Sequence, residues 1–140
     1  MVSKKGKEMR RELKFRAWDK VARQMIYSVW INGNGTIRVS PNGNPEEYHC
    51  LEDKRYSDRY IVMQYTGLKD RNKKEIWEGD VGLSSLRPTI GEIMWCEDQA
   101  AFRMSCRDGF EKFTCDEALF FEVKSNIFNK VNLSGEYYGL

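Results

Sequence analysis

The chain has 140 residues, 41% of them hydrophobic and 13% aromatic, and its formal net charge at pH 7 is +2. A chain of this length forms one domain more often than two. The apolar content excludes a wholly disordered chain, and the balanced charge excludes a polycation such as a histone tail. The composition is typical of an ordinary soluble protein with a single core.

The sequence predicts neither a membrane anchor nor a secretion signal. No stretch approaches the ~20 apolar residues that span a bilayer, and the basic start MVSKKGKEMRRELK has no apolar run behind it. The four cysteines form no CxxC pair, which favours reduced thiols and a cytoplasmic location. His49 and Cys50 are the only adjacent candidate ligands for zinc, so we expect no metal site and no other cofactor.

The first half of the chain predicts short hairpins. Residues 13–18 alternate between two faces, which is the period of a half-buried strand. The β-branched and aromatic run 25–31 is predicted as the partner strand of a hairpin. Asn34-Gly35 tolerates positive φ and therefore predicts a tight turn into a short strand over residues 36–39.

The second half predicts more strands and one helix. Thr114 followed three residues later by Glu117 has the form of a capping box, which predicts a short helix over residues 115–120. Many short strands with one brief helix indicate a mostly β fold, either a barrel or a partly open sheet. The predicted strands are residues 60–65, 75–77, 91–96, 100–104, 110–113 and 121–128.

The charge is unevenly distributed along the chain. Residues 1–74 carry a net charge of +8 and residues 75–140 a net charge of −6. A cationic face could bind nucleic acid, because each neutralised phosphate releases condensed counterions. Against this, charge runs are more often solvated surfaces, and the acidic half would repel a long polyanion. The candidate phosphate contacts are Lys14, Arg16, Lys69, Arg71, Lys73 and Lys74, with Trp18, Tyr65 or Trp77 available for base stacking.

The same charge split suggests self-association as an alternative. A basic face on one copy can meet an acidic face on the next, and such head-to-tail contacts close into rings when the rotation allows. A homo-oligomer is therefore one of the expected assemblies.

The sequence offers little for nucleophilic catalysis. His49 is the only histidine, so a triad of the Ser-His-Asp type could be built only around it, and we interpret it as an ordinary exposed residue. The chain contains neither a GxxxxGK[ST] phosphate loop nor a GxGxxG motif, which excludes nucleotide binding by those two mechanisms.

Four carboxylates lie close together in the sequence: Asp70, Glu75, Glu78 and Asp80. Paired carboxylates can perform acid and base chemistry or hold a hard cation such as magnesium. Asp70 lies in a charged turn, however, and Glu78-Gly79-Asp80 lies in a predicted bend, where acidic side chains often hydrogen-bond local backbone. We therefore favour structural roles and keep a metal-dependent hydrolase using Glu78 and Asp80 as a further alternative.

Three stretches stand in the same order as in a known family: LKFRAWDK at 13–20, MQYTGLKDRNKKEIWEGDV at 63–81 and EVKSNIFNK at 122–130. Together they resemble the YopX family of small phage and prophage proteins. The chain departs from the family pattern in four places. Gly82 follows Val81 where the family has a hydrophobic pair, so a short or bulged strand is expected there. Asn72-Lys73 replaces Asn-Gly in the central turn, Ser125 replaces a glycine, and Val131 replaces a proline, so a different turn type and an altered tail are expected.

The resemblance implies a mostly β protein whose later half is a small SH3-like or partly open barrel, with an N-terminal β-hairpin extension and one short helix. Residues 1–8 would be a flexible extension, and residues 9–140 a single domain with hairpins over 9–59 and the barrel-like part over 60–140. No catalytic residue can be carried over from the family. Its motif residues imply a framework role for Trp18, Asp19, Tyr65, Thr66, Gly67, Leu68, Glu78, Gly79 and Asp80.

These observations favour a non-enzymatic accessory protein of a phage or prophage in the bacterial cytoplasm. Its partner would be an unknown macromolecule or further copies of itself, with no membrane involved. The main alternative is a nucleic-acid-binding module that uses the basic N-terminal half.

Overall fold

The structure is a computed structural model that describes residues 11–86, 89–106 and 109–129. The first six strands are β1 (Phe15–Asp19), β2 (Gln24–Ile26), β3 (Val29–Ile31), β4 (Ile37–Val39), β5 (His49–Cys50) and β6 (Tyr60–Lys69). The remaining elements are β7 (Glu75–Trp77), β8 (Asp80–Ser84), β9 (Thr89–Cys96), β10 (Ala101–Cys106), β11 (Gly109–Lys112), α1 (Cys115–Ala118) and β12 (Phe121–Asn126). The predicted mostly β fold is confirmed. The predicted extension 1–8 and Val131 lie outside the described residues.

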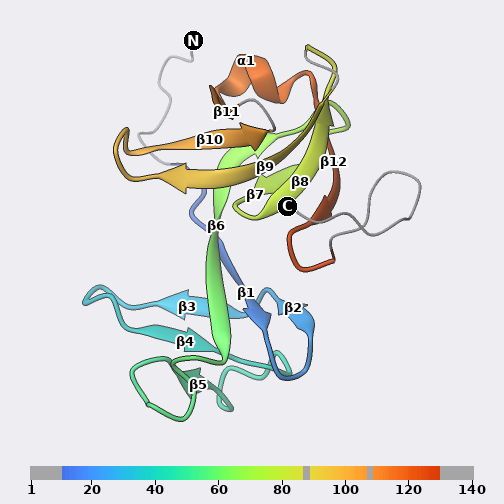
Figure 1. Cartoon of the computed structure of the whole chain (residues 1–140). Coiled ribbons are helices and arrows are strands. Elements are labelled where there is room, and N and C mark those ends of the chain that lie inside the picture. The colour runs from blue at the N-terminus through green and yellow to red at the C-terminus, as the bar shows by residue number, and fades with distance from the viewer. Residues whose placement is uncertain (1–10, 87–88, 107–108, 130–140) are drawn as a thin grey trace.

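Strands β1 and β6 connect two lobes (Figure 1). They belong to a sheet of order β2-β1-β6-β7, in which the first half of β6 pairs with β1 and its second half with β7. The register of β6 and β7 shifts between Tyr65 and Lys69, where Gly67 adopts a φ of +86° that favours glycine. The predicted strand over residues 60–65 is therefore confirmed and continues into the second lobe.

The N-terminal lobe packs the three-stranded sheet β3-β4-β5 against β1 and β2, around a core of Ala17, Ile26, Val39 and Tyr60. The prediction of one strand over residues 25–31 is wrong. The run splits at residues 27–28, so that β2 pairs with β1 and β3 pairs with β4. Ile26 and Val29 both face this core. Because residues three apart lie on opposite faces of a continuous strand, the strand has to break between them.

The C-terminal lobe is a curled half-barrel of order β11-β10-β9-β8-β12 (Figure 1). Its core contains Ile76, Ile93, Met104, Phe113, Ala118 and Phe121. A Cβ atom on Gly82 would lie 2.3 Å from the carbonyl oxygen of Glu122 and 2.5 Å from the Phe121 ring. The absence of a side chain at Gly82 therefore allows β12 to approach β8 closely. The pairing of these strands is irregular between Val123 and Ser125.

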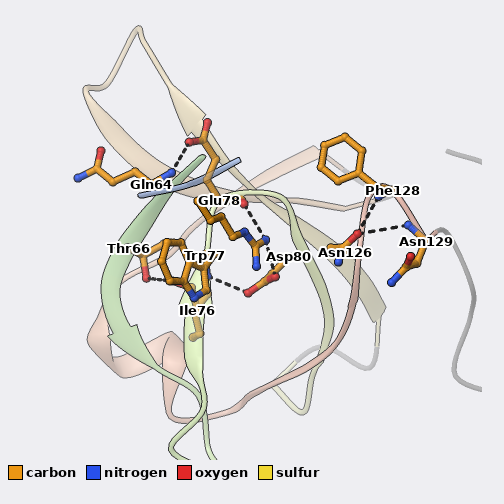
Figure 2. A network of polar contacts seen from close by, with 10 residues as sticks. Gln64, Thr66, Ile76, Trp77, Glu78, Asp80, Asn126, Phe128 and Asn129 are labelled. Atoms are coloured by element: carbon orange, nitrogen blue, oxygen red, sulfur yellow. Dashed lines mark hydrogen bonds and ion pairs between the residues drawn. The ribbon is translucent and has the colours of Figure 1, made fainter. Parts of the chain in front are cut away.

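Helix α1 begins as predicted, because the Glu117 carboxylate accepts a hydrogen bond from the Thr114 N–H at 3.0 Å. The helix ends at Ala118, two residues before the predicted end, and a turn over residues 119–120 leads into β12. The last strand also ends two residues early, at Asn126. Its side-chain oxygen accepts hydrogen bonds from the N–H groups of Phe128 and Asn129, which turn the chain (Figure 2).

All four cysteines are free thiols, with Cys115 exposed and the others partly buried. Among the described residues, no helix has the length and apolar character needed to cross a lipid bilayer.

Candidate functional site

Two hollows lie side by side between the lobes and form what we call the interlobe groove. The first, called the polar hollow, has a volume of about 600 Å³, and the second, called the apolar hollow, about 670 Å³. Tyr27, Glu75 and Trp77 line both of them, which makes the groove continuous. The polar hollow is completed by Arg16, Lys74, Asp80, Val123, Lys124, Ser125, Asn126 and Asn129, and the apolar hollow by Leu13, Lys14, Phe15, Val29, Trp30 and Ile31.

A buried ion pair between Arg16 and Asp80 forms one wall of the polar hollow. Arg16 and Asp80 are each 3% exposed, and Arg16 Nη2 lies 2.9 Å from Asp80 Oδ1. Arg16 also donates to the carbonyl oxygen of Glu78 at 3.2 Å, while Asp80 Oδ2 accepts the Trp77 N–H at 2.8 Å (Figure 2). Burial raises the pKa of Asp80, and the charge of Arg16 opposes that rise. The pair links β1 to β8 and fixes Trp77 at the groove.

Aromatic rings give the groove its apolar character. Trp77 is 6% exposed, and the Arg16 guanidinium lies 5.2 Å from its ring centroid. Tyr27 is 60% exposed and meets Trp77 edge to face, with 5.6 Å between ring centroids. Tyr27 therefore presents a large open aromatic surface, and Trp30, which is 39% exposed, presents another in the apolar hollow.

Four predicted phosphate contacts lie together in the turn between β6 and β7. Lys69, Arg71, Lys73 and Lys74 are all exposed there. The buried Asp70 carboxylate shapes this turn by accepting the N–H groups of Asn72, Lys74 and Val123 at 2.8 to 2.9 Å. We call residues 69–74 the basic turn. Since Lys74 also lines the polar hollow, the basic turn and the interlobe groove form one surface.

The other two predicted phosphate contacts already bind carboxylates within the protein. Lys14 forms an ion pair with Glu75, and its ammonium lies 4.8 Å from the centroid of the Tyr65 ring. Arg16 is buried against Asp80 and is not accessible to a phosphate group. Both ion pairs join a cation of the basic half of the sequence to a carboxylate of the acidic half.

The aromatic residues expected to stack on bases are buried. Trp18 stacks on Phe128 with 4.7 Å between parallel rings, and Tyr65 is 3% exposed. Tyr27, which the sequence analysis did not single out, is the more accessible ring. Its only signal in the sequence was its place inside a run that looked like one strand.

Several family-motif residues form hydrogen bonds within the protein. Asp19 is fully buried and forms two hydrogen bonds with Arg59, of 2.9 and 3.0 Å. Burial alone would raise the pKa of Asp19, but the bonds from Arg59 and from two backbone N–H groups lower it overall. Thr66 Oγ1 donates to the carbonyl of Ile76 at 2.7 Å, and Glu78 Oε1 accepts the Gln64 N–H at 3.1 Å (Figure 2).

The candidate catalytic groups also have structural partners. Asp70, Glu75, Glu78 and Asp80 each accept a hydrogen bond or an ion pair described above. Within the described residues, no group of three or more His, Cys, Asp or Glu side chains is arranged so that it could hold a metal ion. His49 is partly buried rather than exposed as expected. It stacks on Tyr56 at 3.8 Å and its Nδ1 lies 2.6 Å from the Tyr60 hydroxyl.

Comparison with known proteins identifies the family. The sequence profile described as YopX protein matches residues 14–133. The chain belongs to the YopX family. It is also similar in structure to protein EF1440 from Enterococcus faecalis, with a TM-score of 0.60 and 25% sequence identity, over 86% of this chain and 96% of that one. No curated protein matches the chain.

Proposed function

We propose that this YopX-family protein acts without catalysis and binds a single-stranded nucleic acid along the interlobe groove and the basic turn. The protein would serve a phage or prophage as an accessory protein in the bacterial cytoplasm. The proposal joins the two leading interpretations of the sequence, a non-enzymatic binding protein and a nucleic-acid-binding module.

The observation that carries the proposal is the position of an exposed ring beside exposed cations. Tyr27 is 60% exposed and lines the same hollow as Lys74, which ends the basic turn. Proteins that bind single strands combine a cationic surface for the backbone with aromatic rings on which bases stack. A double helix would not offer its bases to such a ring, so the arrangement favours a single strand.

The contacts that the acidic side chains already make within the protein support the non-enzymatic part of the proposal. Asp80 is held by Arg16 and Trp77, and Glu78 by the backbone of Gln64. A carboxylate that activates water or holds a metal ion needs free lone pairs directed at the substrate. A magnesium-dependent nuclease assay tests for catalysis. Cleavage of nucleic acid by the unmodified protein that is lost in Glu78→Gln would contradict the non-enzymatic proposal.

Fluorescence anisotropy with a labelled oligothymidylate tests nucleic-acid binding directly. If three or four phosphates are contacted, raising salt from about 50 to 200 mM should weaken affinity roughly 20- to 50-fold, because the slope for single strands is about −0.7 per contact. Replacing Lys69, Arg71 and Lys73 with Gln should flatten this dependence. Lys54→Gln, at an exposed position in the N-terminal lobe, is the matched control. Absence of binding at low salt, or an unchanged slope in the triple variant, would overturn the proposal.

Self-assembly is a second candidate, favoured by the charges of +8 and −6 on the two parts of the chain. Exposed cations of the basic turn on one copy could meet exposed acids such as Asp116 of α1 on another. Light scattering at low salt tests it: an oligomer that dissociates as salt rises supports self-assembly, and a monomer at low salt excludes it.

A further inference from the structure

The polar hollow has the size and lining of a site for a small, partly polar group. Its volume of about 600 Å³ lies within the roughly 300–1,000 Å³ typical of small-molecule sites. Its walls come from both lobes, with Tyr27 and Trp77 on one side and Ser125, Asn126 and Asn129 at the end of β12 on the other. One side is therefore aromatic and the other is rich in hydrogen-bonding groups.

The charges around the polar hollow leave it cationic. Its two carboxylates already have partners, since Glu75 pairs with Lys14 and Asp80 with Arg16. Lys74 is exposed at the hollow and has no ion-pair partner within the described residues. A polyanion therefore complements this site better than a neutral or cationic ligand would.

Polar groups at the walls lack partners. The buried atoms Ser125 Oγ and Arg16 Nε have no hydrogen-bond partner among the described residues. Arg16 is 3% exposed, so this orphan atom belongs to a deeply buried side chain. Buried polar atoms without a partner are rare in native proteins and point to a water molecule or a ligand nearby. The Asn129 side chain, which is exposed at the hollow, is likewise not engaged by another described side chain.

We propose that the polar hollow receives one unstacked base of the bound strand. The base stacks on the open face of Tyr27, the side chain of Asn129 lies at its hydrogen-bonding edge, and Lys74 contacts the neighbouring phosphate. This inference rests on the proposed function, because it assumes that a single strand is bound. It adds which hollow takes a base and which side chains contact that base and its phosphate.

Two strands with the same backbone charge separate the contribution of the bases to affinity from that of the phosphates. The first is an oligothymidylate of about twelve nucleotides, and the second is an abasic chain of the same length. The protein should bind the first about 10-fold more tightly, since stacking on one aromatic ring contributes measurably to single-strand affinity. Tyr27→Ala should reduce this preference to near unity, whereas Tyr27→Phe should keep it. Asn129→Ala should lower it partly.

The controls distinguish the possible failures. Tyr27 is 60% exposed, so Tyr27→Ala should keep its thermal stability, and Trp95→Ala removes a 43% exposed ring that lies outside the interlobe groove. Failure to bind either strand would overturn the proposed function and this inference with it. Equal binding of both strands by the unmodified protein, or an undiminished preference in Tyr27→Ala, would overturn the inference and leave phosphate binding intact.

Discussion

Replacing Arg16 with Met should destabilise the protein strongly, because it leaves the Asp80 carboxylate buried without its cation. Removing one partner of a buried ion pair costs roughly 3–5 kcal/mol. Asp80 keeps the hydrogen bond from the Trp77 N–H at 2.8 Å, and it can take up a proton, so we expect a loss of about 3 kcal/mol at pH 7.

The pH dependence of that loss has a definite sign. Burial already raises the pKa of Asp80, and removal of Arg16 raises it further. A carboxyl group whose pKa is higher in the folded state binds more protons there, so the variant gains stability as the pH falls toward the pKa of the unfolded chain. The difference between the variant and the unmodified protein should therefore shrink as the pH falls toward the ordinary pKa of an aspartate.

Urea unfolding followed by tryptophan fluorescence measures these effects. The double variant Arg16→Met, Asp80→Asn should recover part of the lost stability, because it removes the isolated charge and keeps an acceptor for Trp77. We expect a coupling free energy of about 1–3 kcal/mol from the complete double-mutant cycle. A loss below about 1 kcal/mol in Arg16→Met, or strictly additive effects, would refute the assignment of this pair as the link between the lobes.

Three further predictions concern stability. Lys73→Gly should stabilise the protein by about 0.5–1 kcal/mol in urea unfolding, because Lys73 has a φ of +66° that glycine adopts more easily; a loss of stability would contradict this. Gly82→Ala should lower the free energy of unfolding by about 3 kcal/mol, because the new Cβ atom would lie 2.3 Å from the Glu122 carbonyl oxygen. The control Gly33→Ala should have little effect, because the space around Gly33 is open. Burial lowers the pKa of His49, so the folded state resists its protonation and stability should fall as the pH drops through about 6.5. His49→Gln should remove this dependence, because His49 is the only histidine, and a persisting slope would show that other groups cause it.

Local patterns predicted most of the strands and the start of the helix. The alternation in residues 13–18 predicted the strand β1, although β1 is buried on both faces and not half-buried as expected, and the Thr114–Glu117 capping box acts over a single turn. These signals survive in the sequence because the interactions that they describe join near neighbours. The family motif drew attention to residues such as Asp19, Thr66 and Glu78, which form hydrogen bonds within the protein.

Long-range packing was not predictable from the sequence alone. Arg16 looked like one more cation of a basic run, but its partner Asp80 lies 64 residues away. The break at residues 27–28 is required only because Ile26 and Val29 face the same core, which becomes visible once the second sheet is in place. That break is also what places Tyr27 at the interlobe groove, so the candidate site depends on the least predictable part of the fold.

Heteronuclear NMR during titration with an oligothymidylate tests the central claim most directly. If a single strand follows the interlobe groove and the basic turn, backbone signals should shift around Tyr27, in residues 69–77 and at the end of β12, while the β9–β10 hairpin stays unchanged. Shifts confined to the β9–β10 hairpin, or no shift at a protein concentration at which anisotropy reports binding, would contradict the account.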